Sequence, residues 1–188
     1  MPNWCSNVIE LNGPATTLNQ VWEQATDPDV PGFLNALVPL KTEWTIDHAI
    51  ESWGTKWDIM PDESSLEYSE YSVNGVTMAT IEGSFDSAWS PPVAAITEFC
   101  HKNPDIDAEL FYYEPANDYC GSLNLGDVEI SSVGRDFFEK DPLGQQIDHH
   151  FDVISDMLYE QELMEEEIIT EPLTLNNPEE EPNEKDVN

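Results

Sequence analysis

The sequence has 188 residues, with 39 acidic and 6 basic side chains and a formal net charge of −33. A hydrophobic content of 39%, including 10% aromatic residues, suffices for a packed core and excludes a wholly disordered chain. There is no run of about 18 apolar residues that could span a membrane, and the shortage of Lys and Arg argues against direct binding to nucleic acid or anionic lipid. Any partner is therefore expected to be a basic protein.

The first half of the chain predicts a strand, two helices and a hairpin. A short strand at 8–11 ends at an Asn-Gly-Pro breaker, and a helix follows in which apolar residues recur at spacings of three and four. A second short helix is expected from Thr45 to Trp53, with Gly54 as its left-handed cap. The Asn74-Gly75 pair between alternating apolar residues indicates a tight two-residue β-hairpin turn.

The second half predicts one more helix and further strands. Pro91 and Pro92 introduce a helix with an apolar stripe, which ends before the Asn-Pro pair at 103–104. A strand at 108–113 and a hairpin within 119–131 follow. Two main helices on one face of an antiparallel sheet make an α+β fold of the ferredoxin-like kind, and this is the predicted fold class.

The C-terminal part predicts a long acidic helix over 144–169, because apolar residues recur every three or four positions between Ile147 and Leu158. Prolines and runs of glutamate in the last residues predict a disordered acidic tail. Two interpretations of the helix stay open: it packs back on the domain, or it docks on a partner or on a second copy in a homodimer. The predicted organisation is a ferredoxin-like domain over 1–140, an acidic amphipathic helix over 141–169 and a disordered tail over 170–188.

The negative charge is not confined to that tail. Residues 1–151 hold 26 acidic and 5 basic side chains, and residues 152–188 hold 13 acidic and 1 basic. An acidic tail alone would indicate solubility. An acidic body that also carries a core indicates a surface that a basic partner recognises.

The residues that could carry chemistry form no catalytic motif. Cys5, Cys100 and Cys120 lack C-x-x-C spacing and fit reduced thiols in a cytosolic protein. The first residues have neither the basic nor the apolar region of a secretory signal, so a cytoplasmic location is expected. Metal-ligand spacings, a phosphate-binding loop and a nucleophile elbow are all missing. We therefore expect a non-enzymatic protein without a metal site or cofactor.

Four strings occur together in this chain: Met1–Asn7, Trp53–Asp58, Phe85–Pro92 and Glu114–Gly121. As a set they resemble the YubB-like ferredoxin-like domain family, small proteins carried by phages and plasmids. The resemblance spans about residues 1–131 and implies the same ferredoxin-like fold. It also implies a mobile-element setting, in which small accessory proteins often act on host defence systems. The family supplies no established activity, cofactor or catalytic residue.

The first functional hypothesis is an inhibitor with an acidic, DNA-mimic-like surface. Its carboxylates would occupy the nucleic-acid-binding site of a basic host nuclease, restriction enzyme or CRISPR-type effector in the host cytoplasm. Binding of this kind weakens steeply with salt. The candidate contact residues lie on the acidic helix and on the expected edge hairpin: Asp148, Asp152, Asp156, Glu160, Glu162, Glu165, Glu166, Glu167, Asp62, Glu63, Glu67 and Glu70.

The alternative is a small-ligand-binding or structural phage domain in which the charge serves only solubility. Four of the tryptophans either pack in the core or line an aromatic pocket. Lys56 either pairs with Asp58 and stacks on a ring, or binds an anionic ligand. The candidate pocket residues are Trp4, Asn7, Trp53, Lys56, Trp57, Asp58 and Trp89.

Overall fold

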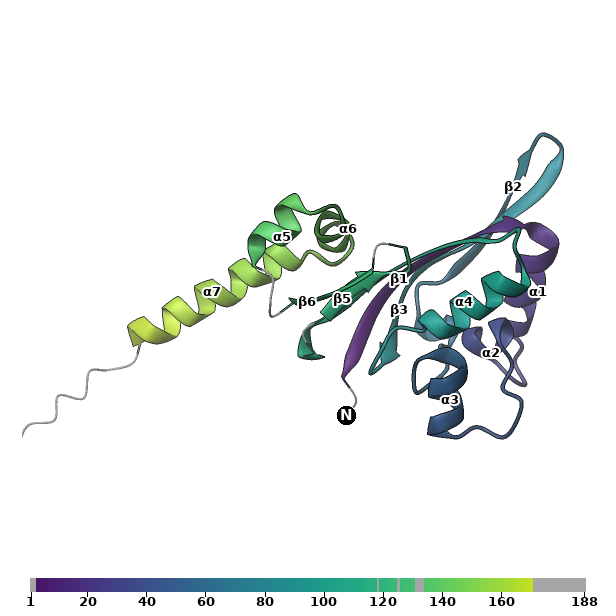
Figure 1. Cartoon of the computed structure of the whole chain (residues 1–188), viewed down its shortest axis with the longest axis horizontal. Helices are drawn as coiled ribbons and strands as arrows, with labels where there is room; N and C mark the ends of the chain where they lie inside the picture. Colours follow the sequence, from purple (N-terminus) through teal and green to yellow (C-terminus); the bar gives the residue numbers. More distant parts are fainter. Residues whose placement is uncertain (1–2, 118, 125, 131–133, 171–188) are drawn as a thin grey trace, which may run out of the picture. The chain divides into compact units, whose positions relative to one another are not determined.

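The computed structural model describes residues 3–117, 119–124, 126–130 and 134–170, with the backbone alone at 127, 129 and 165–170. The chain divides into a compact unit that runs to Ile154 and a second unit that begins at Ser155. In the described residues the compact unit is built on a six-stranded antiparallel sheet in the order β2-β3-β1-β4-β5-β6 (Figure 1).

The strands differ widely in length, and the helices fall between and after them. The strands are β1 Trp4–Pro14, β2 Glu67–Val73, β3 Val76–Ala88, β4 Asp107–Glu114, β5 Tyr119–Ser122 and β6 Gly126–Glu129. The helices are α1 Ala15–Ala25, α2 Phe33–Leu37, α3 Ile46–Trp53, α4 Val93–Lys102, α5 Arg135–Lys140, α6 Pro142–Phe151 and α7 Val153–Thr170. Two 3₁₀ turns complete the set, η1 Pro61–Glu63 and η2 Pro115–Asn117.

The order of the first four strands confirms the predicted α+β, ferredoxin-like fold class. β1 lies at the centre and pairs antiparallel with both β3 and β4, while β2 pairs only with β3. α1 follows β1 and α4 joins β3 to β4, which is the β-α-β-β-α-β order of this fold. The short helices α2 and α3 are inserted between α1 and β2, and β5 and β6 extend the sheet beyond β4 (Figure 1).

Alternation along β1 separates the two faces of the sheet. Cys5, Asn7, Ile9 and Leu11 are all buried, and these odd-numbered positions face the main core. The core includes Leu18 and Val21 of α1 together with Ile96 and Phe99 of α4, so the two helices cover the face to which the odd-numbered residues point. The even-numbered residues of β1 point to the opposite face.

The β2–β3 hairpin confirms the turn predicted from Asn74-Gly75. Val73 pairs with Val76 across the turn, and the two turn residues have φ values of 53° and 83°. Positive φ at both central residues is the type I′ geometry, which Asn and Gly adopt at little cost. α3 is also confirmed: the Thr45 side chain accepts a hydrogen bond from the His48 N–H, and Gly54 ends the helix with φ 86°.

The prediction of one long helix over 144–169 is wrong. α6 ends at Phe151, and α7 begins at Val153, because Asp152 lies in the left-handed region with φ 52° and ψ 35°. The Asp152 N–H donates to the Asp148 carbonyl at 2.9 Å, and the Asp148 side chain accepts from the Ile154 N–H at 2.8 Å. These bonds satisfy the backbone at the break, so two helices replace one.

α6 packs back on the sheet, and so belongs with the folded domain. It contacts β4 and β5 on the face that α1 and α4 leave open: His150 lies against Phe111 with ring centroids 4.8 Å apart, and Phe151 stacks on Tyr113 at 6.0 Å. Leu143 and Ile147 of α6 are buried. The compact unit therefore extends past the predicted boundary at 140. Of the predicted tail at 170–188, residues 171–188 lie outside the described residues.

Candidate partner-binding face of the sheet

Four glutamates form a row across the open face of the sheet. Glu67 of β2 pairs with Glu82 of β3, Glu82 with Glu10 of β1, and Glu10 with Glu109 of β4. All four side chains are exposed. Neighbouring strands lie about 4.8 Å apart, so the acidic row, as we call these four residues, spans about 14 Å.

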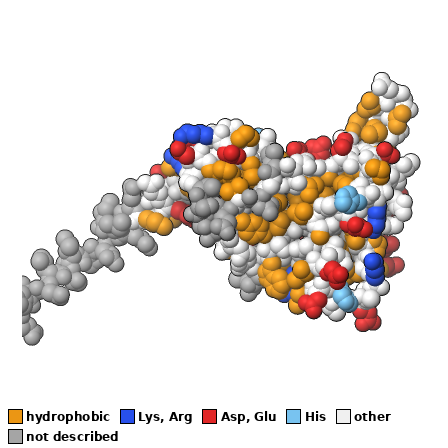
Figure 2. Space-filling view, in the orientation of Figure 1, with side chains coloured by type: hydrophobic (Ala, Val, Ile, Leu, Met, Phe, Trp, Pro, Cys, Tyr) orange, Lys and Arg blue, Asp and Glu red, His pale blue; other side chains and the backbone are white. Residues whose placement is uncertain are grey.

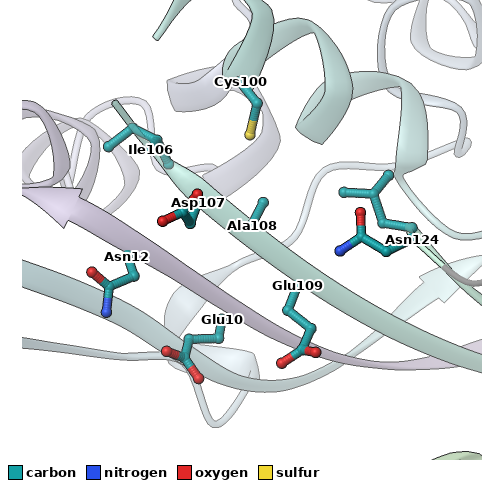
Figure 3. Close-up of a pocket in the computed structure, with 9 residues that line it drawn as sticks. Glu10, Asn12, Cys100, Ile106, Asp107, Ala108, Glu109 and Asn124 are labelled. Atoms are coloured by element: carbon teal, nitrogen blue, oxygen red, sulfur yellow. The ribbon is translucent and has the colours of Figure 1, made fainter. Parts of the chain in front are cut away.

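Further carboxylates lie on the same face. Asp86 of β3 pairs with Ser6, whose hydroxyl donates to the Asp86 carboxylate at 3.0 Å, and Asp107 of β4 pairs with Asn12. Figure 3 shows the carboxylates of Glu10 and Glu109 turned to the same side of the sheet, next to a cavity of about 490 Å³. The acidic row is thus the centre of a wider acidic surface.

No Lys or Arg side chain neutralises the acidic row in the part of the chain that the structure describes. The ion pairs there join Lys102 to Glu98, Arg135 to Glu139 and Lys140 to Asp136, each between successive turns of one helix. The imidazole of His150 lies near Glu109, but burial lowers the pKa of His150 and so disfavours its charged form. Figure 2 shows the face covered by α1 and α4, where blue basic groups are likewise fewer than red acidic ones. Like charges directly opposite each other destabilise a sheet, so the row is retained at a cost to the fold.

The acidic residues predicted around the edge hairpin fall in three places. Asp62 and Glu63 are exposed in η1, which precedes the hairpin, so their predicted position on it is wrong. Glu67 belongs to the acidic row. Glu70 lies on the opposite face, where its carboxylate accepts a hydrogen bond from the Tyr68 hydroxyl at 2.6 Å.

The acidic residues predicted on the C-terminal helix divide between the two units. Asp148 and Asp152 belong to the break between α6 and α7, and there the Asp148 carboxylate has a structural role. Asp156, Glu160 and Glu162 are exposed on α7 in the second unit. The side chains of Glu165, Glu166 and Glu167 lie outside the described residues.

Sequence reasoning missed Glu10, Glu82 and Glu109. Glu10 stands between two buried residues in the alternating pattern of β1, whereas Glu82 and Glu109 each adjoin a run of three buried residues. Their alignment depends on the order and register of four strands that are far apart in sequence. The alternation could have found Glu10 as an exposed position, but the pairing of the strands is needed to find the row.

Three of the predicted pocket residues have structural roles. Trp53 is only 2% exposed, and its indole N–H donates to the Val38 carbonyl at 2.8 Å. Asn7 is buried and its amide donates to the Cys5 carbonyl and to the Ser87 hydroxyl. The Asp58 carboxylate accepts from backbone N–H groups at the start of α2, so it is not a partner for Lys56.

The other four predicted pocket residues lie together at the surface. The Lys56 ammonium lies 4.4 Å from the ring centroid of Trp57 and 4.7 Å from that of Trp89, and the Trp4 and Trp57 centroids are 5.8 Å apart. The three indoles are 37–46% exposed. We call these four residues the tryptophan cluster.

A cavity of about 440 Å³ adjoins the tryptophan cluster. Its walls include Trp4 and Trp57, and three acidic residues, Asp58, Glu63 and Asp86, also line it. Carboxylates repel an anion, so this cavity does not favour the anionic ligand that Lys56 suggested in the sequence. It fits a ligand with an apolar body and a positive charge.

The described residues offer little for catalysis by a thiol or a metal ion. Burial, together with nearby acidic side chains, raises the pKa of Cys5 to about 12, so this thiol stays protonated and unreactive. No group of three or more His, Cys, Asp or Glu side chains in the described part of the chain can hold a metal ion. Among the same residues, no helix has the length and apolarity needed to cross a membrane.

Comparisons with known proteins assign no family to this chain. A scan of family profiles found no match, and searches of curated proteins and of solved structures found none either. The resemblance to YubB-like domains therefore remains a prediction from the four sequence strings.

Proposed function

We propose that this chain is a non-enzymatic inhibitor that binds a basic, nucleic-acid-handling protein through the acidic open face of its sheet. The observation that carries the proposal is the acidic row, in which four strands each place a glutamate in register. A rigid sheet fixes the spacing of these carboxylates, whereas an acidic tail would leave them in many arrangements. A partner can therefore recognise the row as a defined surface.

The physical basis is competition for a phosphate-binding site. Duplex DNA carries one negative charge per about 1.7 Å of its axis, and proteins neutralise it with Lys and Arg. A row of four carboxylates over about 14 Å, flanked by Asp86 and Asp107, offers such a site an alternative set of anions. Complementary potentials also accelerate the encounter with a basic partner.

The sequence resemblance supports the setting of this proposal. If the gene is carried by a phage or plasmid, the partner is a host restriction enzyme, CRISPR-type effector or other nuclease, and the complex forms in the host cytoplasm. The chain would then have an antirestriction or anti-CRISPR role. Direct binding to nucleic acid is not part of the proposal, because the net charge of −33 repels phosphate.

The test uses a panel of purified restriction and CRISPR-type nucleases with fluorescent duplex DNA. The chain is expected to displace DNA from at least one of them at about 50 mM salt and to lose most of this effect at about 300 mM. A variant that neutralises the row is expected to inhibit at least tenfold more weakly, in line with the loss of several charge contacts. Its substitutions are Glu10→Gln, Glu67→Gln, Glu82→Gln and Glu109→Gln.

A charge-matched control separates the row from net charge. It neutralises four exposed acidic residues outside the row: Asp29→Asn, Glu43→Gln, Glu51→Gln and Asp105→Asn. We expect this control to inhibit as the wild type does. The proposal is overturned if no member of the panel is bound at low salt, or if the two variants lose inhibition equally.

A second candidate function is binding of a small cationic ligand at the tryptophan cluster. The observation that favours it is the set of three exposed indoles beside a cavity of about 440 Å³. A cationic ligand with an apolar body should shift the indole N–H signals of Trp4 and Trp57 in NMR spectra and leave that of Trp44 unchanged. Trp57→Ala should abolish these shifts without changing nuclease inhibition, and intact shifts would exclude this site.

A further inference from the structure

The outer edge of β2 is open in the described part of the chain. β2 lies at the end of the sheet, with β3 on one side and no described strand on the other (Figure 1). Val73 and Val76 flank a two-residue turn, so they exchange both backbone hydrogen bonds. Hydrogen-bonded and non-hydrogen-bonded pairs alternate along an antiparallel ladder, so every second residue of β2 counted back from Val73 bonds to β3. The backbone N–H and C=O groups of the residues between them, Tyr68, Glu70 and Ser72, point outward, away from β3.

This edge lacks most of the features that usually prevent strand pairing. Natural edge strands are protected by shortness, prolines, bulges or charged side chains, lysine above all. β2 has seven residues, contains no proline, lysine or glycine, and pairs with β3 without a bulge. The hairpin also exposes Tyr71, Val73 and Val76. Figure 2 shows orange hydrophobic side chains on the projecting hairpin.

The charge of β2 selects the strand that can pair with it. Glu67 ends the acidic row at this edge, and Glu70 lies on the opposite face. Two copies of β2 would bring like charges together, which disfavours self-pairing. A strand with Lys or Arg opposite Glu67 would instead place an opposite charge beside the row, at the distance of directly paired residues.

We propose that the β2 edge accepts an extended basic segment of the partner as a seventh strand of the sheet. This inference rests on the proposed function, and it specifies that the partner's contact segment is extended and basic. The added strand would bond to the outward backbone groups of Tyr68, Glu70 and Ser72, while basic side chains meet Glu67 on one face and Glu70 on the other. Main-chain bonds provide affinity and the paired charges provide selectivity.

The test uses the full chain and an extended peptide of about eight residues that repeats Lys-Lys-Thr-Thr, which places Lys on both faces of the sheet, at low salt. The control peptide has the same sequence but is N-methylated at alternate residues, so it keeps every charge and loses the N–H donors of one edge. Amide exchange is expected to slow about tenfold at Tyr68, Glu70 and Ser72 with the first peptide only. Amides of β4 in the same sheet, such as that of Leu110, are expected to keep their exchange rates.

Two variants separate backbone pairing from charge. Glu70→Pro removes an outward N–H at a position where an edge strand tolerates proline, and it should weaken peptide binding about tenfold. Glu70→Gln keeps the N–H and should weaken binding only about threefold, the effect of one exposed charge. If Glu70→Pro fails to fold, the two peptides still compare binding with and without backbone N–H donors, at the same charge, on the wild-type protein.

The outcomes distinguish this inference from the proposed function. Unprotected amides at Tyr68, Glu70 and Ser72, or equal binding of the two peptides, overturn the edge inference. Absence of peptide binding at low salt overturns it as well. Nuclease inhibition that depends on the acidic row can persist in each of these cases, and the nuclease panel alone decides the proposed function.

Discussion

Asp58 and Lys56 stand two positions apart in the sequence, yet their surroundings differ completely. The Asp58 carboxylate accepts hydrogen bonds from the backbone N–H groups of Leu34, Asn35 and Ile59 at 2.7–3.1 Å. Lys56 instead lies between two indole rings. Opposite charges close in sequence suggest an ion pair, but N–H groups at the start of α2 satisfy the carboxylate first.

The role of Asp58 predicts both a stability loss and a pH dependence. Asp58→Ala should lower the free energy of unfolding by about 1 kcal/mol, because the N–H groups of Leu34 and Asn35 lose their acceptor. Burial raises the pKa of Asp58 despite three backbone hydrogen bonds that lower it. As pH rises above the ordinary value of 3.8, the unfolded chain therefore releases this proton before the folded chain does.

The wild type is accordingly expected to lose stability relative to Asp58→Asn as pH rises from about 3 to about 6. Urea unfolding of both proteins at each pH measures this difference. A stability difference that is independent of pH, or that grows in favour of the wild type, contradicts the proposed effect of burial on Asp58.

Lys56 should stabilise the protein through its charge. Lys56→Met keeps most of the apolar stem but loses the cation between Trp57 and Trp89, so we expect a loss of about 1 kcal/mol in urea unfolding. Lys56→Arg should retain most of the stability. Lys41→Met removes a cation that lies in no described ion pair or ring contact, and it serves as the control. Equal stability of Lys56→Met and the wild type would show that the stacked cation contributes nothing.

At the scale of the elements, the break between α6 and α7 shows how backbone geometry overrides a side-chain pattern. The apolar spacing from Ile147 to Leu158 continues through Asp152 as if one helix were present. Asp152 nevertheless has φ 52° and ψ 35°, and its N–H closes α6 on the Asp148 carbonyl. The break leaves α6 to pack on β4 and β5 as a short helix.

Substitution at Asp152 distinguishes the broken helix from a continuous one. In a continuous helix Asp152→Ala would stabilise, because Ala has the higher helix propensity. In the left-handed conformation Ala costs about 1 kcal/mol relative to glycine, so Asp152→Ala should be less stable than Asp152→Gly. Thermal unfolding of the two variants gives the order, and an Ala variant more stable than the Gly variant would contradict the break.

Local signals account for what the sequence predicts well. The Asn74-Gly75 turn and the cap at Gly54 are set by a few neighbouring residues, and each appears as expected. Features that depend on distant residues were missed or misplaced. The break at Asp152 depends on the bond from Asp148 and on packing against β4, and the acidic row depends on the register of four strands.

At the scale of the whole molecule, the sheet order converts a diffuse charge into a defined surface. The net charge of −33 says only that a partner should be basic. The order β2-β3-β1-β4 brings Glu67, Glu82, Glu10 and Glu109 into register, although up to 99 positions separate them in the sequence. The sequence therefore predicted that the partner is basic and that Glu67 is a contact residue. The other three residues of the row, Glu10, Glu82 and Glu109, follow only from the fold.

Glu10 occupies one of the two inner positions of the row, where a glutamate lies on each side: Glu82 on one and Glu109 on the other. Glu10→Gln should therefore stabilise the protein by roughly 0.5 kcal/mol in urea unfolding at low salt, and the gain should vanish at about 1 M salt. Glu43→Gln, at an exposed residue outside the row, should show little gain. Equal gains in the two variants would mean that net charge alone is responsible. A stabilising Glu10→Gln that also weakens nuclease inhibition would show that the row trades stability for binding, which is expected of a functional surface and not of one that serves solubility.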